Sequence, residues 1–335
     1  MNILYKLTFV ILAIFFFWIG SLSLGDGPYW PWYSDYVNGQ CDEYWWSPTF
    51  FLSSVAPEYS FSQIYPLEGC FSWAWYISVE IMCFICTPVL IYLFYKKKIV
   101  GISITGVIII FSIFCGIIIC TFENLSVGIG EQTDSEHGDY YNQYYSKPYT
   151  RMHSYFLGVL ITFCLHMKPS LRVPVFIRII IYAIVWPVIW CLFFITYNIW
   201  NRGGWNDTEN VIFAALHHPV FSCCFAISIY LMSLGYKGPL NLRNFFAHRF
   251  WIPFSKLSYG VYLYTPVIIL MSSFCAQISL AYTSRYIVYQ FFVFSVIAFA
   301  GSLGQYILIE RPLLLTFDFF VDLSRIAYAK RKINK

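Results

Sequence analysis

The sequence predicts an all-α fold, a bundle of about eight helices that span a membrane. Hydrophobic residues make up 59% of the 335-residue chain and charged residues only 11%. A soluble domain needs about twice that share of charge to hydrate its surface. Apolar stretches recur that approach the roughly 20 residues needed to cross the hydrocarbon of a bilayer. Lys and Arg gather in alternate connecting segments, as in multi-pass membrane proteins.

Eight apolar stretches are predicted to cross the membrane. They are residues 6–25, 72–95, 99–121, 152–167, 175–199, 211–235, 257–277 and 286–309. The stretch at 152–167 is the shortest. Residues 6–25 also fit a secretory signal peptide, because Lys6 precedes an apolar core and the small residue Ser23 follows it. Cleavage there would leave seven spans and an external N-terminus.

The basic residues orient these spans. When the turn at residues 96–98 (Lys-Lys-Lys) is placed in the cytosol, 17 of the 21 Lys and Arg residues fall on that side, as the positive-inside rule requires. Both chain ends are then cytosolic. Asn124 and Asn206 each begin an Asn-x-Ser/Thr sequon in an outer segment, where glycosylation can occur. The net charge of +4 reflects this loop bias and does not indicate nucleic-acid binding.

The cysteines agree with this topology. Nine of the 11 fall inside predicted spans, where Cys packs as a small apolar residue. Cys41 and Cys70 lie in the outer segment that follows the first span, an oxidising compartment. A disulfide between them is predicted, with two free thiols as the alternative.

The last 25 residues are not predicted to span. Residues 311–335 mix apolar and charged side chains and are basic at 330–332, which suits an amphipathic helix on the cytosolic face of the membrane. A disordered basic end is the alternative. The sequence thus predicts a membrane domain at 1–320 and a basic cytosolic tail at 321–335.

Ionisable side chains inside spans are costly and therefore mark candidate functional groups. Glu80 lies about eight residues into the second span, and His217 and His218 lie about seven residues into the sixth, at similar depth in the outer half. Arg151 and His153 stand at the outer end of the fourth span. A carboxylate that faces a histidine suits general acid–base chemistry, and a buried polar network that joins helices is the alternative. The sequence contains no zinc-ligand spacing and no phosphate-binding loop.

Several short motifs follow one another along almost the whole chain. They are Gly25-Asp26-Gly27-Pro28-Tyr29-Trp30, Tyr44-Trp45-Trp46, Trp73-Ala74-Trp75-Tyr76-Ile77-Ser78-Val79-Glu80, Tyr145-Ser146-Lys147-Pro148-Tyr149-Thr150-Arg151, Leu257-Ser258-Tyr259-Gly260-Val261-Tyr262-Leu263 and Glu310-Arg311-Pro312. In this order and spacing the chain resembles the nose-resistant-to-fluoxetine branch of membrane acyltransferase family 3.

The resemblance implies a bundle of about ten spans that transfers an acyl group from a donor, usually acyl-CoA, to a hydroxyl-bearing acceptor. In this branch it also implies a link to lipid handling. It implies that Trp75, Tyr76 and Glu80 line the site and that Arg151 helps to shape it. The family's cysteines that flank the outer segment add support to the pairing of Cys41 with Cys70. No bound cofactor or metal is expected.

The chain departs from the family's pattern in three places. The family's catalytic arginine and histidine belong to an earlier span, and the first span here resembles the family's third, so the resemblance implies either a longer native chain with about two more spans or a substitute base within this one. Thr265 stands where a histidine is usual, and His218 where an arginine is common. Because acyl transfer needs a base for the acceptor's proton, His218 is the candidate substitute base.

The sequence thus predicts an acyltransferase-like membrane protein whose partners are membrane lipid, an acyl donor and a hydroxyl acceptor. The catalytic candidates are Glu80 and His218, and the substrate-binding candidates are Trp75, Tyr76, Arg151 and Thr265. The alternative is a non-catalytic lipid-binding or lipid-transport protein that kept the fold. A channel is disfavoured, since one buried carboxylate without a charged ring makes a poor ion path.

Overall fold

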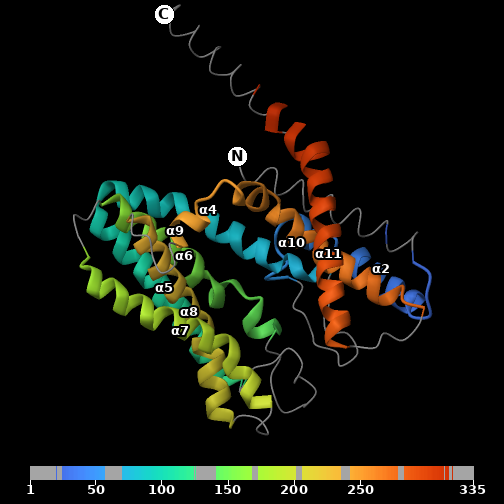
Figure 1. The fold of residues 1–335 in the computed structure, drawn as a ribbon, viewed down its shortest axis with the longest axis horizontal. Helices are drawn as coiled ribbons and strands as arrows, with labels where there is room; N and C mark the ends of the chain where they lie inside the picture. The colour runs from blue at the N-terminus through green and yellow to red at the C-terminus, as the bar shows by residue number, and fades with distance from the viewer. Residues whose placement is uncertain are drawn as a thin grey trace, which may run out of the picture. The chain divides into compact units, whose positions relative to one another are not determined.

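The fold was analysed in a computed structural model, in which every regular element of the described chain is a helix (Figure 1). The structure describes residues 20, 25–56, 70–123, 125, 141–167, 173–200, 206–234, 242–277, 283–312, 314–316 and 319. The described residues form two compact units. The first unit draws on Met1–Phe50, Gly69–Ala74 and Arg249–Lys335, and the second on Phe51–Glu68 and Trp75–His248.

The second unit is a bundle of long helices, coloured from cyan to yellow in Figure 1. Its elements are α4 (Trp75–Lys96), α5 (Lys98–Phe122), the π-helical turn η2 (Tyr141–Tyr145), α6 (Pro148–His166), α7 (Val175–Trp200), α8 (Asp207–Ser233) and the short α9 (Leu242–Phe246). Helix α6 packs against α4, α5 and α8, α5 also packs against α4 and α8, and α7 packs against α8.

Six helices are long and apolar enough to cross a membrane, which makes this a multi-pass membrane protein. They are α4, α5, α7, α8, α10 (Trp251–Phe274) and α11 (Ser284–Gln305), the last with the residues that continue it to Thr316. They coincide with six of the eight predicted spans. Of the predicted span at 6–25, the structure describes only residues 20 and 25. The total of about eight therefore stays a prediction.

Helix α6 covers the predicted span at 152–167 but is not among these six. It begins earlier, at Pro148, because proline suits the first turn of a helix, where its missing N–H is not needed. The added turn brings Arg151 into the helix beside His153, and both lower its apolar character. Helix α6, with these two polar side chains near its start, packs among α4, α5 and α8.

Helix α5 shows how the bundle packs. The face that it buries carries mostly small residues three or four positions apart: Gly101, Thr105, Ile109, Ser112, Gly116 and Cys120. Small side chains let neighbouring helices approach closely, which is how membrane helices associate. Large apolar residues such as Val107, Phe111 and Phe114 are exposed on the rest of α5, as suits a surface in contact with lipid.

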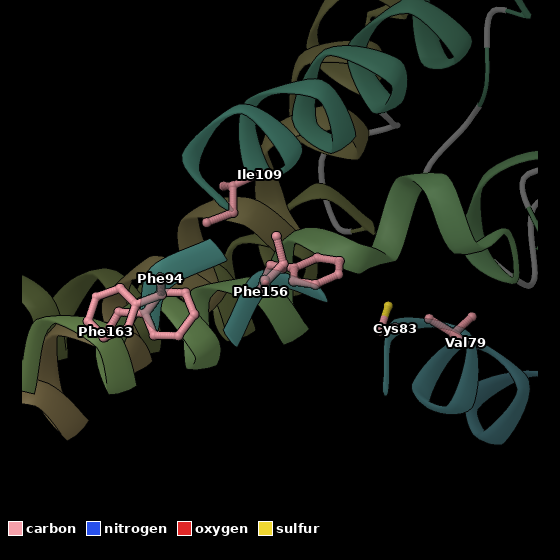
Figure 2. Packing of buried hydrophobic residues seen from close by; sticks show 7 residues of the cluster. Val79, Cys83, Phe94, Ile109, Phe156 and Phe163 are labelled. Carbon is pink, nitrogen blue, oxygen red and sulfur yellow. The ribbon is translucent and has the colours of Figure 1, made fainter. Parts of the chain in front are cut away.

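A cluster of buried side chains joins α4, α5 and α6 (Figure 2). The rings of Phe94 and Phe163 stack with centroids 4.2 Å apart, and Ile109, Phe156 and Cys83 belong to the same cluster. Because lipid is as apolar as these side chains, close packing rather than exclusion of water stabilises the cluster.

Gly101 is the position where α5 leaves least room for a side chain. A Cβ atom there would lie 2.6 Å from Cα of Phe94, a main-chain atom of α4, whereas a Cβ at Gly106 would meet nothing within 4 Å. We expect Gly101→Ala to destabilise the protein by roughly 1–3 kcal/mol because it forces α4 and α5 apart. Thermal unfolding in lipid nanodiscs would measure this, with Gly106→Ala as the matched control. Equal melting temperatures for the two variants would contradict the prediction.

The first unit holds α2 (Trp30–Tyr44), α3 (Trp46–Thr49), the 3₁₀ turn η1 (Ser72–Ala74), α10, α11 and the π-helical turn η4 (Tyr306–Glu310). Helices α10 and α11 lie side by side (Figure 1). Their contact is close because Gly260 faces Ser302, whose hydroxyl donates to the Leu257 carbonyl at 2.9 Å. Tyr33 of α2 stacks on Phe274 at the end of α10, with ring centroids 4.3 Å apart.

The disulfide between Cys41 and Cys70 is present, which confirms that prediction. It ties the last turn of α2 to the segment before η1, and both cysteines are buried. The next residue, Phe71, has a left-handed backbone with φ of 63°. A non-glycine residue in this region is strained. Burial of its ring, which packs on Trp73 at 4.5 Å, helps to hold it there.

Other sequence predictions fall partly or wholly outside the described residues. Asn124 lies outside them, and so does the basic tail at 321–335. Asn206 is described, and it is exposed directly before α8. Its main-chain N–H donates to the Glu209 carboxylate at 3.2 Å. This capping interaction explains why α8 begins at Asp207, four residues before the predicted span.

Candidate functional site

One layer of the second unit brings together residues from four elements. Arg151 comes from the first turns of α6, Trp75 is the first residue of α4, Tyr144 and Tyr145 belong to η2, and His218 lies on α8. We call these five residues the Arg151 layer. Trp75, Arg151 and His218 were predicted as site residues, and the structure brings them together around η2.

Arg151 is held mainly by aromatic rings. Its Cζ lies 4.3 Å from the ring centroid of Tyr145, 5.5 Å from that of Tyr144 and 5.8 Å from that of Trp75. Its Nε donates to the Tyr145 carbonyl at 2.8 Å. A guanidinium over aromatic faces gains electrostatic attraction from the ring quadrupoles, more so where water is excluded. The side chain is therefore fixed in one position.

The η2 turn is itself fixed by its neighbours. The Thr150 hydroxyl lies 2.5 Å from the Tyr144 carbonyl and 2.8 Å from the Lys147 carbonyl, so it can donate to either. The Tyr144 ring is buried against Gly116 of α5, where a Cβ would lie 3.1 Å from the ring, and it also packs near Ala214 of α8. Glycine at 116 therefore makes room for the ring that supports Arg151.

Three histidines lie close to Arg151. His153, two residues after Arg151 on α6, is fully buried, and Ser112 of α5 accepts its main-chain N–H at 3.2 Å and lies 3.3 Å from its Nδ1. The ring centroids of His217 and His218 are 4.5 Å apart. The Arg151 guanidinium acts electrostatically on all three imidazoles.

His218 is the histidine that meets η2. Its ring centroid lies 6.3 Å from that of Tyr144 and 6.2 Å from that of Tyr145. His217 stacks instead on Phe213 of its own helix, at 4.9 Å. Although the histidines are close, no group of three or more His, Cys, Asp or Glu side chains within the described ranges could hold a metal ion.

The other predicted site residues lie elsewhere on the helices. Glu80 is half-buried on α4, about 7.5 Å along the axis from Trp75, and it acts electrostatically on Tyr76 and Cys83, one turn to either side. Tyr76 is 50% exposed and meets the Trp75 ring edge-on at 6.1 Å. Thr265 belongs to the first unit, and its hydroxyl donates to the Val261 carbonyl of its own helix at 2.7 Å.

Comparison with known proteins supports the resemblance noted in the sequence. Over 309 residues, 87% of this chain, the sequence is 22% identical to nose resistant to fluoxetine protein 6 of Caenorhabditis elegans. The match covers 36% of that protein, so the chain spans about a third of the length of the curated relative it matches. No family model matches the sequence, and no solved structure matches it. The match supports a relationship to this nose-resistant-to-fluoxetine protein.

Three residues that build the site were not predicted as site residues: Tyr144, Tyr145 and Ser112. Ser112 belongs to the small-residue face of α5, and its spacing from Thr105 and Gly116 is visible in the sequence. That pattern predicts which face of α5 is buried. It does not predict that His153 is the residue opposite. Tyr144 precedes the Tyr145–Arg151 motif by one residue, but it falls in a polar segment that gives no helical periodicity.

Proposed function

We propose that this chain is an acyltransferase-like membrane protein that transfers an acyl group from acyl-CoA to a hydroxyl acceptor at the Arg151 layer. The observation that carries the proposal is the convergence of a fixed cation, aromatic faces and the His218 imidazole from α4, η2, α6 and α8. The similarity to the nose-resistant-to-fluoxetine protein supports it.

In the proposed reaction His218 acts as the general base. Its imidazole accepts the proton of the acceptor hydroxyl while the hydroxyl oxygen attacks the thioester carbonyl of acyl-CoA. Arg151 lies near enough to stabilise negative charge that develops on the carbonyl oxygen. Collapse of the tetrahedral intermediate breaks the carbon–sulfur bond, and the CoA thiolate takes a proton from the imidazolium. The products are an ester and free CoA. We further propose that Glu80, a carboxylate on α4, stabilises the positively charged imidazolium of His218.

The test is acyl transfer by the purified protein. With radiolabelled acyl-CoA and candidate hydroxyl acceptors, we expect label to move to the acceptor and free CoA to appear in equal amount. The matched control is the same protein with the non-hydrolysable thioether analogue of the donor. Binding of both substrates without any transfer of label would contradict the enzyme proposal.

A second candidate is a non-catalytic protein that binds or transports lipid with the same fold. The observation that favours it is Thr265, which stands where the resemblance implies a histidine and whose hydroxyl is bonded within α10. Under this proposal the protein exchanges fluorescent lipid between vesicles although it transfers no acyl label. Equal exchange rates with and without the protein would count against it.

We also propose that both chain ends are cytosolic, in a plasma or internal membrane, with α8 starting on the outer side. Asn206 is exposed at the start of α8, so we expect it to carry an N-linked glycan when the chain is made in eukaryotic cells. Asn206→Gln should remove a glycosidase-sensitive mobility shift. A new sequon in the tail at 321–335 should stay unmodified. A glycan on that tail would show that the orientation is the opposite of the one proposed.

A further inference from the structure

We infer that the Arg151 layer binds the head group of an anionic lipid, a carboxylate or phosphate carried on a hydrocarbon chain. The inference rests on the proposed function in that it names a ligand class for the same site. It concerns binding alone and requires no turnover.

The first argument is charge. A guanidinium is a cation, and the contacts that the described residues give Arg151 are one main-chain carbonyl and three aromatic rings. Its neighbours are the rings of Trp75, Tyr144 and Tyr145. A partly buried charge among apolar groups is costly unless an opposite charge accompanies it. An anionic ligand would supply the missing charge.

The second argument is the direction of the donors. Aromatic rings engage the faces of a guanidinium, whereas its N–H groups point outward in its own plane. Nε donates to the Tyr145 carbonyl, but Nη2 is buried and has no hydrogen-bond partner among the residues that the structure describes. A buried donor without a partner is destabilising, because it has lost its hydrogen bonds to water. A carboxylate or phosphate has two oxygens at the spacing that the fork of a guanidinium accepts.

The third argument concerns what surrounds the charge. Trp75 packs both over Arg151 and against the apolar cluster of Val79, Cys83 and Phe156. The residue after Arg151, Met152, packs against the same cluster. A ligand bound at Arg151 therefore meets hydrocarbon on one side. This arrangement suits a lipid with one charged end better than a free inorganic anion.

The test on the unaltered protein compares ligands that share one chain. In nanodiscs of zwitterionic lipid, oleate and oleoyl lysophosphatidate should each bind at least about ten-fold more tightly than oleyl alcohol, measured with radiolabelled ligand. Whichever of the two anions binds with higher affinity identifies the preferred head group, a carboxylate for oleate or a phosphate for oleoyl lysophosphatidate. Equal affinity for the alcohol and both anions would overturn the inference, and so would competition by inorganic phosphate alone.

The test by substitution uses two arginines at helix starts. Arg151→Gln should weaken binding of the preferred anion at least about ten-fold and leave oleyl alcohol unchanged, because only the charged fork is lost. Arg285, exposed in the first turn of α11, is the control, and Arg285→Gln should bind like the unaltered protein. Unchanged anion affinity in Arg151→Gln would refute the inference. If that variant does not fold, the ligand comparison on the unaltered protein decides.

The inference and the proposed function fail separately. Anion binding without acyl transfer would leave the inference standing and remove the enzyme proposal. Acyl transfer by a protein that binds oleate and oleyl alcohol equally would remove the inference alone.

Discussion

Replacement of His218 by alanine is expected to slow acyl transfer about 100-fold, because a positioned general base typically contributes that much or more. His218 is the histidine whose ring meets Tyr144 and Tyr145. The substitution leaves the Nε bond and ring contacts of Arg151 in place, so binding of anionic lipid should change little. Initial rates with radiolabelled acyl-CoA at saturating concentration measure the effect.

His166 provides the matched control. It lies at the far end of α6, is exposed, and meets Phe94 edge-on at 5.9 Å. His166→Ala should therefore keep the rate of the unaltered protein. A His218→Ala variant that transfers label within two-fold of that rate would show that another group is the base. His217, whose ring stacks on Phe213, would then be the next residue to replace.

Removal of the disulfide, by the double substitution Cys41→Ser and Cys70→Ser, should lower the free energy of unfolding by about 3 kcal/mol. The bridge closes a loop with a sequence separation of 29 residues and so restricts the unfolded chain. It also helps to hold Phe71 in its left-handed conformation, which costs about 1–3 kcal/mol on its own. Thermal unfolding in nanodiscs, with and without reducing agent, measures the change.

Cys86 is the control for this experiment. It is an exposed free cysteine on α4, and Cys86→Ser should unfold like the unaltered protein. Reducing agent should lower the melting temperature of the unaltered protein and of Cys86→Ser, but not that of the double variant. A melting temperature independent of both the substitution and the reductant would show that the bridge does not stabilise the fold.

The spans were the most predictable part of the fold, because hydrocarbon thickness sets a length that any apolar stretch must match. Six of the eight stretches form such helices. Helix ends were less predictable because they depend on local capping. Pro148 starts α6 and the Asn206–Glu209 pair starts α8, each four residues before the predicted span. The disulfide was predictable because the other cysteines fall in spans.

The sequence predicted how far along its span each candidate side chain lies, but not which face of each helix is turned inward. Counting residues along a span estimates the height of a side chain in the membrane, and it put Glu80 and His218 at similar depth, with Arg151 at the outer end of its span. The face that each helix turns inward depends on packing, which is why the role of Tyr144 did not follow from the sequence. The pairing of Glu80 with His218 stays a prediction, since it rests on depth alone.

The position of α6 also bears on how the protein enters the membrane during synthesis. A segment that carries Arg151 and His153 near one end costs more to place in lipid than the apolar stretch of α5. Helices α4 and α5 are made first, and a turn at Lys97 joins them, so they can already stand in the bilayer as a hairpin when α6 leaves the ribosome. The small-residue face of α5, rather than lipid, can then receive the polar start of α6.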